Sequence, residues 1–283
     1  MRHRACWAAA AVLAMSMSAN AADFEKSAID GWHLSLQGWT YNWLTVVEVI
    51  DKAKELGIEY IEEFPGQKIS KDVPGGFDQN MSAAATKVVQ DKLAETGCKI
   101  VAFGVTGVPG DEKGLRKMLD WAKSWGIGVI NTEVGKGQFP LMDKLAGEYG
   151  IKFALHNHPK GASQYWSPDI VLAAIQGYPN IGDCADTGHW ARSNLVPVEC
   201  LKKLEGHVFH FHFKDLGANK VDKPWGTGVN DARGQLEEAK RQNFKGCFSI
   251  EYETGRGDKQ LDDHVRACVE WWFKTVAEIA AEK

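Results

Sequence analysis

Acidic and imidazole side chains recur at the ends of short apolar runs in this sequence. Glu133 follows the run INT, and His156 and His158 follow FAL. Asp186 closes the run GDCAD. Carboxylates and neutral imidazoles are common protein ligands of divalent cations, and they are also the common general acids and bases. One such residue at a strand end is usually a solvated rim group, but their recurrence indicates a shared metal site.

Three further runs carry the same residue types, because Glu62 lies in IEYIEE and Glu251 follows FSI. His210 and His212 alternate within HVFHFHF, which Lys214 follows. Residues two apart in a strand share a face, so His212, nearer the end of the run, is the better ligand. Burying so many ionisable groups together is costly unless a cation neutralises them. We therefore expect one divalent ion, of Mn, Co, Mg or Zn, held without a thiolate.

Such a site needs a scaffold that brings strand ends together. The short apolar runs begin near Trp32, Ile58, Lys99, Ile127, Ile151, Ile181, His207 and Lys245. Helical patterns lie between them, for example over 44–56, 115–125 and 261–281. Eight such units predict an α/β protein, a (β/α)8 TIM barrel in a single domain, whose active site lies at the C-terminal strand ends. An open doubly wound sheet is less favoured, because no glycine fingerprint follows the first run.

The first residues have the pattern of an export signal. A basic start, an apolar stretch and the small residues around Ala21 predict a signal peptide over 1–21, with the barrel over 22–283 and a periplasmic or secreted product. Losing Arg2 and Arg4 moves the formal net charge from −4 to −6. An acidic chain without basic clusters is a poor partner for nucleic acid, and no apolar stretch is long enough to predict a membrane span.

Seven segments carry a family resemblance and span nearly the whole expected mature chain. They are YIEEFPGQ (60–67), INTEV (130–134), ALHNHP (154–159), DCADTGHWAR (183–192), HFHFKD (210–215), PWGTGVND (224–231) and FSIEYE (248–253). In order and position they resemble the sugar phosphate isomerase/epimerase family, with its xylose-isomerase-like TIM barrel. The resemblance is specific to this superfamily and not to one substrate.

The resemblance implies a set of metal ligands. Asp186, His212 and Glu251 match the aspartate, histidine and last glutamate that hold one divalent metal in ketose epimerases of this superfamily. The family often has E-N-H on the fifth strand, whereas this chain has H-N-H starting at His156. The fourth ligand is therefore left open between His156 and Glu133.

Further residues receive roles in catalysis and substrate binding. His158 is the expected base, as in similar E-N-H members, and Lys214 is the second residue with a predicted catalytic role. The residues expected to hold substrate hydroxyls or a sugar ring are Glu62, His189, Arg192 and Trp225. The five cysteines after the signal form no CxxC pair, and their disulfide pairing is left open.

The predicted reaction is isomerisation or epimerisation of a free or keto-sugar, begun by proton removal next to a carbonyl. A lyase or dehydratase acting on 3-keto-glycosides or inososes is the alternative within the superfamily. A metal-dependent endonuclease would need further histidines and a basic face, and a non-catalytic sugar-binding barrel would have no need of the acid–base groups. The expected partner is a small carbohydrate; the oligomeric state is left open, with a homodimer as one option.

Overall fold

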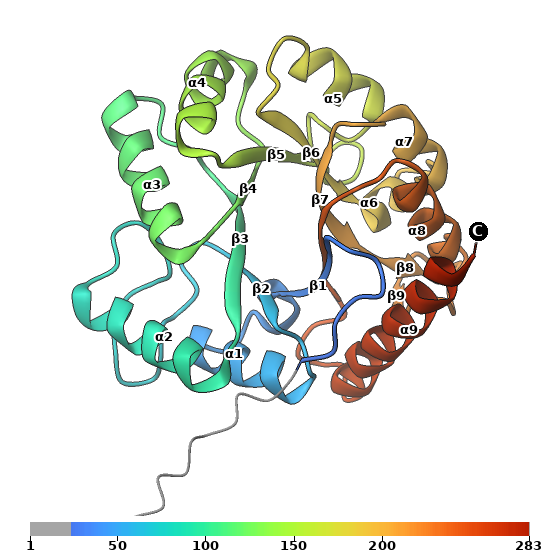
Figure 1. Cartoon of the computed structure of the whole chain (residues 1–283), viewed down its shortest axis with the longest axis horizontal. Coiled ribbons are helices and arrows are strands. Elements are labelled where there is room, and N and C mark those ends of the chain that lie inside the picture. Colours follow the sequence, from blue (N-terminus) through green and yellow to red (C-terminus); the bar gives the residue numbers. More distant parts are fainter. Residues whose placement is uncertain (1–23, 283) are drawn as a thin grey trace, which may run out of the picture.

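Parallel strands close into a barrel in the computed structural model of this chain, which describes residues 24–282. They pair in the order β1-β10-β7-β6-β5-β4-β3-β2, and Figure 1 shows helices around them. The barrel strands are β1 (Trp32–Gln37), β2 (Tyr60–Glu63), β3 (Lys99–Thr106), β4 (Val129–Thr132), β5 (Lys152–His156), β6 (Ile181–Asp186), β7 (Val208–Phe213) and β10 (Gly246–Ile250). The predicted α/β class and (β/α)8 TIM barrel are thus confirmed. The predicted signal peptide over 1–21 lies outside the described residues.

The helices alternate with the strands as the sequence pattern predicted. They are α1 (Val46–Glu55), α2 (Ala83–Thr96), α3 (Glu112–Trp125), α4 (Phe139–Tyr149), α5 (Pro168–Ile175), α6 (Thr187–Arg192), α7 (Pro197–Lys203), α8 (Ala232–Arg241) and α9 (Leu261–Ala281), with short 3-10 turns η1 (Gly38–Tyr41) and η2 (Lys136–Gln138). Two connections hold more structure than the pattern predicted. Both α6 and α7 follow β6, and a two-stranded ribbon, β8 (Asp215–Leu216) with β9 (Asp222–Lys223), follows β7.

The inside of the barrel is polar along part of its axis. Ser35 of β1 and Ser249 of β10 are hydrogen bonded at 2.7 Å, and His210 of β7 lies 2.9 Å from the Ser249 hydroxyl. Glu62 of β2 and Asn131 of β4 meet at 2.6 Å. All five side chains are buried. Barrel interiors are more often filled by branched apolar residues, so this polar column marks an interior that supports a site.

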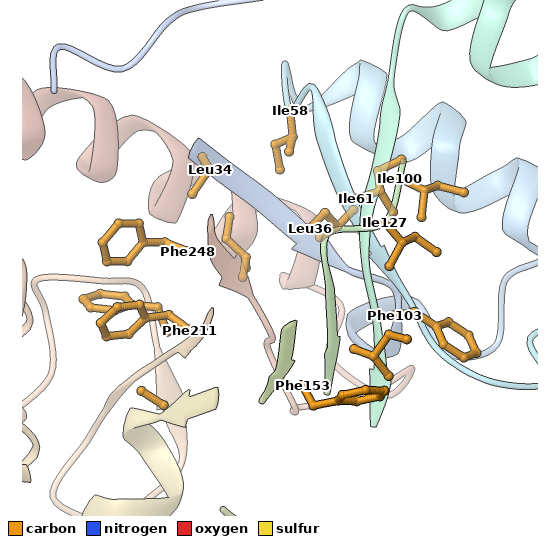
Figure 2. Packing of buried hydrophobic residues seen from close by; sticks show 14 of the residues in the cluster. Leu34, Leu36, Ile58, Ile61, Ile100, Phe103, Ile127, Phe153, Phe211 and Phe248 are labelled. Atoms are coloured by element: carbon orange, nitrogen blue, oxygen red, sulfur yellow. The ribbon is translucent and has the colours of Figure 1, made fainter. Parts of the chain in front are cut away.

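The apolar faces of the same strands point outward to the helices. Phe248 of β10 stacks on Phe211 of β7 with ring centroids 4.7 Å apart, and it also contacts Trp272 of α9. On the other side of the barrel, Phe103 of β3 packs against Trp121 of α3. Figure 2 shows the side chains of this layer. The alternation of polar and apolar residues along the strands thus separates a polar interior from an apolar layer beneath the helices.

Local signals explain where the helices begin and end. In α3, the side chain of Asp111 accepts a hydrogen bond from the Gly114 amide at the N-terminus. Gly126 ends the helix with a φ of 81°, a left-handed conformation that favours glycine. Within residues 24–282, no helix combines the length and apolar character needed to cross a bilayer.

Candidate metal centre and active site

Buried donor atoms from neighbouring strands converge at the C-terminal end of the barrel. His156 ends β5, Asp186 ends β6, His212 lies in β7 and Glu251 directly follows β10. One ligand atom from each of these residues lies within 4.8 Å of the other three. Two imidazole nitrogens and two carboxylate oxygens form a donor set that suits a divalent cation. The structure therefore places His156 in this group, and Glu133 outside it.

In both histidines of the donor group, a carboxylate lies next to the ring nitrogen that faces away from the group. His156 Nδ1 lies 3.2 Å from Glu133 Oε1. His212 Nε2 lies 3.0 Å and 3.1 Å from the two oxygens of Glu62. The other nitrogens, His156 Nε2 and His212 Nδ1, lie 3.1 Å apart inside the group. Metal-binding histidines usually donate their second N–H to a carboxylate or carbonyl, so this arrangement fits a bound metal.

Three carboxylates at and around the centre, Glu62, Glu133 and Asp186, have lowered pKa values. Burial favours a raised pKa at Glu62, but the charges and hydrogen bonds of His212 and His210 hold that pKa well below its ordinary value. Burial has the same effect on Glu133, where hydrogen bonds from His156 and His158 lower the pKa to about 2. At Asp186 the burial effect is overcome by the charge of Lys214 and by the hydrogen bond with His156, which hold the pKa well below its ordinary value. The site thus concentrates negative charge, which suits a cation.

Two short polar side chains fix the backbone at the ends of the ligand strands. Asn157 donates to the Asp186 carbonyl and accepts from the Asp186 amide, both at 2.9 Å. Thr187 accepts from the Lys214 amide at 2.9 Å and donates to the Lys214 carbonyl at 3.0 Å. These bonds link β5 to β6 and β6 to β7 beyond the regular strand pairing. They hold the ligand-bearing ends in register.

A cavity of about 400 Å³ opens next to the donor group. Its lining includes His156, His158, Glu251 and Glu253. The ring of His158 is 43% exposed, and its Nδ1 is hydrogen bonded to Glu133 Oε1. Glu133 therefore contacts both His156, which belongs to the donor group, and His158, which does not. The remaining lining residues are Gln37, Trp39, Phe64, Pro65, Gly104 and Val105.

Comparison with known proteins identifies the family. The sequence profile of a family described as "Xylose isomerase-like TIM barrel" matches residues 50–275. This chain belongs to the xylose isomerase-like TIM barrel family. The match confirms the resemblance identified from the strand-end motifs. Solved structures that share the fold include a D-tagatose 3-epimerase-like protein and a probable 3-DHS dehydratase from Bacillus anthracis.

Solved structures share the architecture of this xylose isomerase-like barrel. An uncharacterised protein from Parabacteroides distasonis ATCC 8503 is 31% identical, with a TM-score of 0.68, over 86% of this chain and 99% of that one. A xylose isomerase-like TIM barrel protein from Mycobacterium smegmatis, solved in complex with magnesium, is 16% identical, with a TM-score of 0.71, over 91% of this chain and 100% of that one. At that identity, the second likeness concerns the fold alone.

Curated relatives of this xylose isomerase-like barrel include inosose dehydratases. The one from Clostridium beijerinckii is 23% identical over 165 residues, which cover 57% of this chain and 54% of the relative. Those from Mesomycoplasma hyopneumoniae are 25% identical over 133 residues and are covered to 43%. The chain spans about half the length of the curated relatives it matches.

Two residues predicted to bind substrate are buried in this xylose isomerase-like barrel. Glu62 has no exposed surface and lies beneath the donor group, bonded to His210 and His212. Trp225 is 2% exposed and packs against Phe213. Neither residue is among those that line the cavity, so a contact of either one with substrate stays a prediction. For Glu62, the alternation of β2 turned the side chain inward, below the level of the ligands.

The other two predicted substrate residues lie behind the donor group and do not line the cavity. Arg192 pairs with Glu253 and with Asp222, and its Nη1 lies 3.0 Å from His189 Nδ1. Burial, with the nearby charges of Lys214 and His156, lowers the pKa of His189 to about 2, although Asp186 favours a higher value. A neutral His189 therefore accepts the hydrogen bond from Arg192. Both residues support the site from outside the cavity.

Three contributors to the site received no role from the sequence. Glu253 lines the cavity, and its position two residues after Glu251 was the signal that could have identified it. Asn157, between the two histidines of H-N-H, fixes the backbone of Asp186. Gln37 closes β1, lines the cavity and donates to the Gly104 carbonyl at 3.0 Å. No pattern in the sequence singled out Gln37.

Proposed function

We propose that this chain is an exported, metal-dependent enzyme that removes a proton next to the carbonyl of a keto-sugar. One observation carries the proposal: each imidazole of the donor group has a carboxylate on its outer nitrogen, and the group opens on a cavity that contains a further histidine. His156, Asp186, His212 and Glu251 would hold the ion, of Mn, Co, Mg or Zn. When bound, a divalent ion polarises a carbonyl and stabilises negative charge that develops on its oxygen.

His158 is the proposed base. Its Nδ1 faces Glu133, which is ionised because its pKa is lowered to about 2. An anionic partner holds the proton on Nδ1 and leaves the lone pair on Nε2, the nitrogen available to a substrate in the cavity. The same anion stabilises the imidazolium that forms when Nε2 takes the proton.

Isomerisation or epimerisation is the first outcome that we propose for the abstracted proton. Returning it to the neighbouring carbon interconverts aldose and ketose, and returning it to the other face of the same carbon inverts that centre. The return to the other face needs a second acid–base group opposite the first. Glu253 is the further carboxylate on the cavity lining, but it is held by Arg192 and Lys214.

Elimination is the second candidate, and two observations favour it. The cavity presents the imidazole of His158, which lies outside the donor group and can take a proton and then return it to a departing oxygen on the same face of the substrate. The curated relatives are named inosose dehydratases. The substrate would then be an inosose or a 3-keto-glycoside, which loses a hydroxyl or alkoxyl group β to the carbonyl.

A substrate panel in deuterated water tests the proposal and separates its outcomes. The mature protein, supplied with Mn²⁺, is incubated with ketoses, inososes and 3-keto-glycosides and followed by NMR. Deuterium at the carbon next to the carbonyl indicates isomerisation or epimerisation, and a new enone indicates elimination. If no panel member exchanges a proton with a metal-containing protein, proton abstraction from these substrate classes is rejected. Metal analysis of the purified protein tests the cofactor, because a non-catalytic sugar-binding barrel has no need of a bound ion.

Export is the part of the proposal that rests on the N-terminal sequence. Expression of the full chain in a Gram-negative host is expected to give a periplasmic product that begins at Ala22. N-terminal sequencing of the periplasmic fraction measures this. A cytoplasmic product that retains residues 1–21 would contradict export.

A further inference from the structure

The ammonium group of Lys214 lies among the carboxylates of the proposed metal centre. Its Nζ is 2.5 Å from Asp186 Oδ2, 2.5 Å from Glu251 Oε2 and 3.1 Å from Glu253 Oε2. The side chain has no exposed surface. Three carboxylates thus lie around one buried ammonium group.

The oxygens that bind Lys214 are also those that face the histidines of the donor group. Asp186 Oδ2 lies 3.5 Å from His156 Nε2, and Glu251 Oε2 lies 3.1 Å from His212 Nδ1. A metal ion bound by the four donors would therefore use the carboxylates that now neutralise the ammonium. Two positive charges competing for the same two anions oppose each other strongly where water is excluded.

The surrounding chain holds Lys214 in this place. Thr187 fixes its backbone through two hydrogen bonds. Gly188 leaves room for its stem, because a Cβ at that position would lie 2.7 Å from Lys214 Cδ and 2.9 Å from its Cβ. The D-T-G-H segment thus supplies a ligand, a backbone clamp and the space for the lysine in three consecutive residues.

We propose that Lys214 is a tethered counter-cation of the metal centre. In the metal-free protein its ammonium neutralises Asp186 and Glu251, which keeps the donor group assembled and avoids buried unpaired charge. When a metal ion binds, the same ammonium opposes it and sets a weaker affinity than the donors alone would give. Glu253 gives the ammonium a third partner, on the cavity side. This inference rests on the metal centre of the proposed function.

Metal affinity and thermal stability of the full-length mature protein test the inference. The dissociation constants of Mn²⁺ and Zn²⁺ are measured by competition with a fluorescent chelator, for wild type, Lys214→Met and the control Lys203→Met. Lys203 is an exposed lysine of α7 paired with Asp169, so its removal changes the net charge by the same amount with the loss of one surface ion pair. We expect Lys214→Met to bind both ions at least about tenfold more tightly than wild type. Lys203→Met should bind them with the wild-type affinity.

The melting temperature gives an independent measurement. Without metal, Lys214→Met should melt below wild type, because its buried carboxylates lack a counter-ion; with metal, its melting temperature should rise by more than that of wild type. Lys214→Gln retains a hydrogen-bonding end but loses the charge. Like Lys214→Met, it is expected to bind metal more tightly than wild type and to melt at a lower temperature without metal.

Two results would overturn the inference in different ways. If wild type binds metal while both Lys214 variants bind it equally or more weakly, Lys214 supports the ligands and does not compete with the ion, and the metal centre itself stands. If wild type binds no metal at micromolar concentrations, the centre and the inference are both rejected.

Discussion

At the scale of single residues, each histidine of the donor group has a carboxylate next to its outer nitrogen. Glu133 stands behind His156, and Glu62 stands behind His212. Partners of this kind fix the tautomer and the orientation of an imidazole and raise its basicity. The roles of Glu62 and Glu133 are therefore distinct from that of a ligand, although all are acidic residues at strand ends.

Substituting Glu62 by glutamine tests the role of the outer carboxylate. The amide retains the size of the side chain but loses the negative charge that receives the His212 N–H. We expect the metal dissociation constant to rise about 10–100-fold, with the barrel still folded by far-ultraviolet circular dichroism. Chelator competition measures the affinity, and an unchanged constant would show that Glu62 contributes to the polar core alone.

Substituting His158 by glutamine separates the base from the ligands. His158 lies outside the four-residue donor group, so the variant should retain full metal occupancy. Turnover of the substrate found in the deuterium panel should fall about 10²–10⁴-fold, the usual contribution of a general base. Metal analysis and solvent-deuterium exchange are measured on the same sample. Exchange at the wild-type rate would exclude His158 as the base.

At the scale of elements, helix ends and strand ends carry the local signals. Thr45 and Glu48 form a reciprocal capping box at the start of α1, the first helix of the barrel. Hydrogen bonds from Lys71 and from Thr45 lower the pKa of Glu48 to about 2. Such a cap stabilises the helix only while the carboxylate is ionised.

The sign of this effect on stability follows from the lowered pKa. The cap contributes fully above the ordinary glutamate pKa, 4.5, and its contribution is lost as the pH falls toward 2. Glu48→Gln should therefore be less stable than wild type at pH 6, and the difference should shrink between pH 4.5 and pH 3. Urea unfolding of both proteins at these pH values, at low and high salt, measures the difference in their free energies of unfolding. A difference that does not change with pH would contradict the assignment.

At the scale of the whole molecule, closure of the barrel joins its first strand to its last. β10 pairs with β1 in register from Trp32–Gly246 to Leu36–Ile250. Phe248 lies at this junction, fully buried and in contact with Trp32 and Phe211. The apolar layer outside the junction therefore supports the strand that leads to Glu251.

Truncation of Phe248 tests how much this junction contributes. Phe248→Ala should lower the free energy of unfolding by about 3–5 kcal/mol, because a large buried ring is replaced by a cavity. Phe248→Leu is the matched control and should lose clearly less. Urea denaturation followed by tryptophan fluorescence measures both. A loss under about 1 kcal/mol for the alanine variant would mean that the surrounding rings close the gap.

The sequence by itself determined the (β/α)8 order and the strand ends that carry acidic and imidazole residues. Strand alternation and helical spacing are local, so they can be identified along the chain without knowing how it closes. For the same reason His212 could be distinguished from His210, which lies deeper in the barrel.

The tertiary structure decided which of these residues meet. The choice of His156 over Glu133 in the donor group, the burial of Glu62 and Trp225, and the pairing of Lys214 with carboxylates from two other strands depend on the stagger between strands and on side-chain direction. These quantities are fixed when the barrel closes and its strands tilt, and a local pattern carries no information about them.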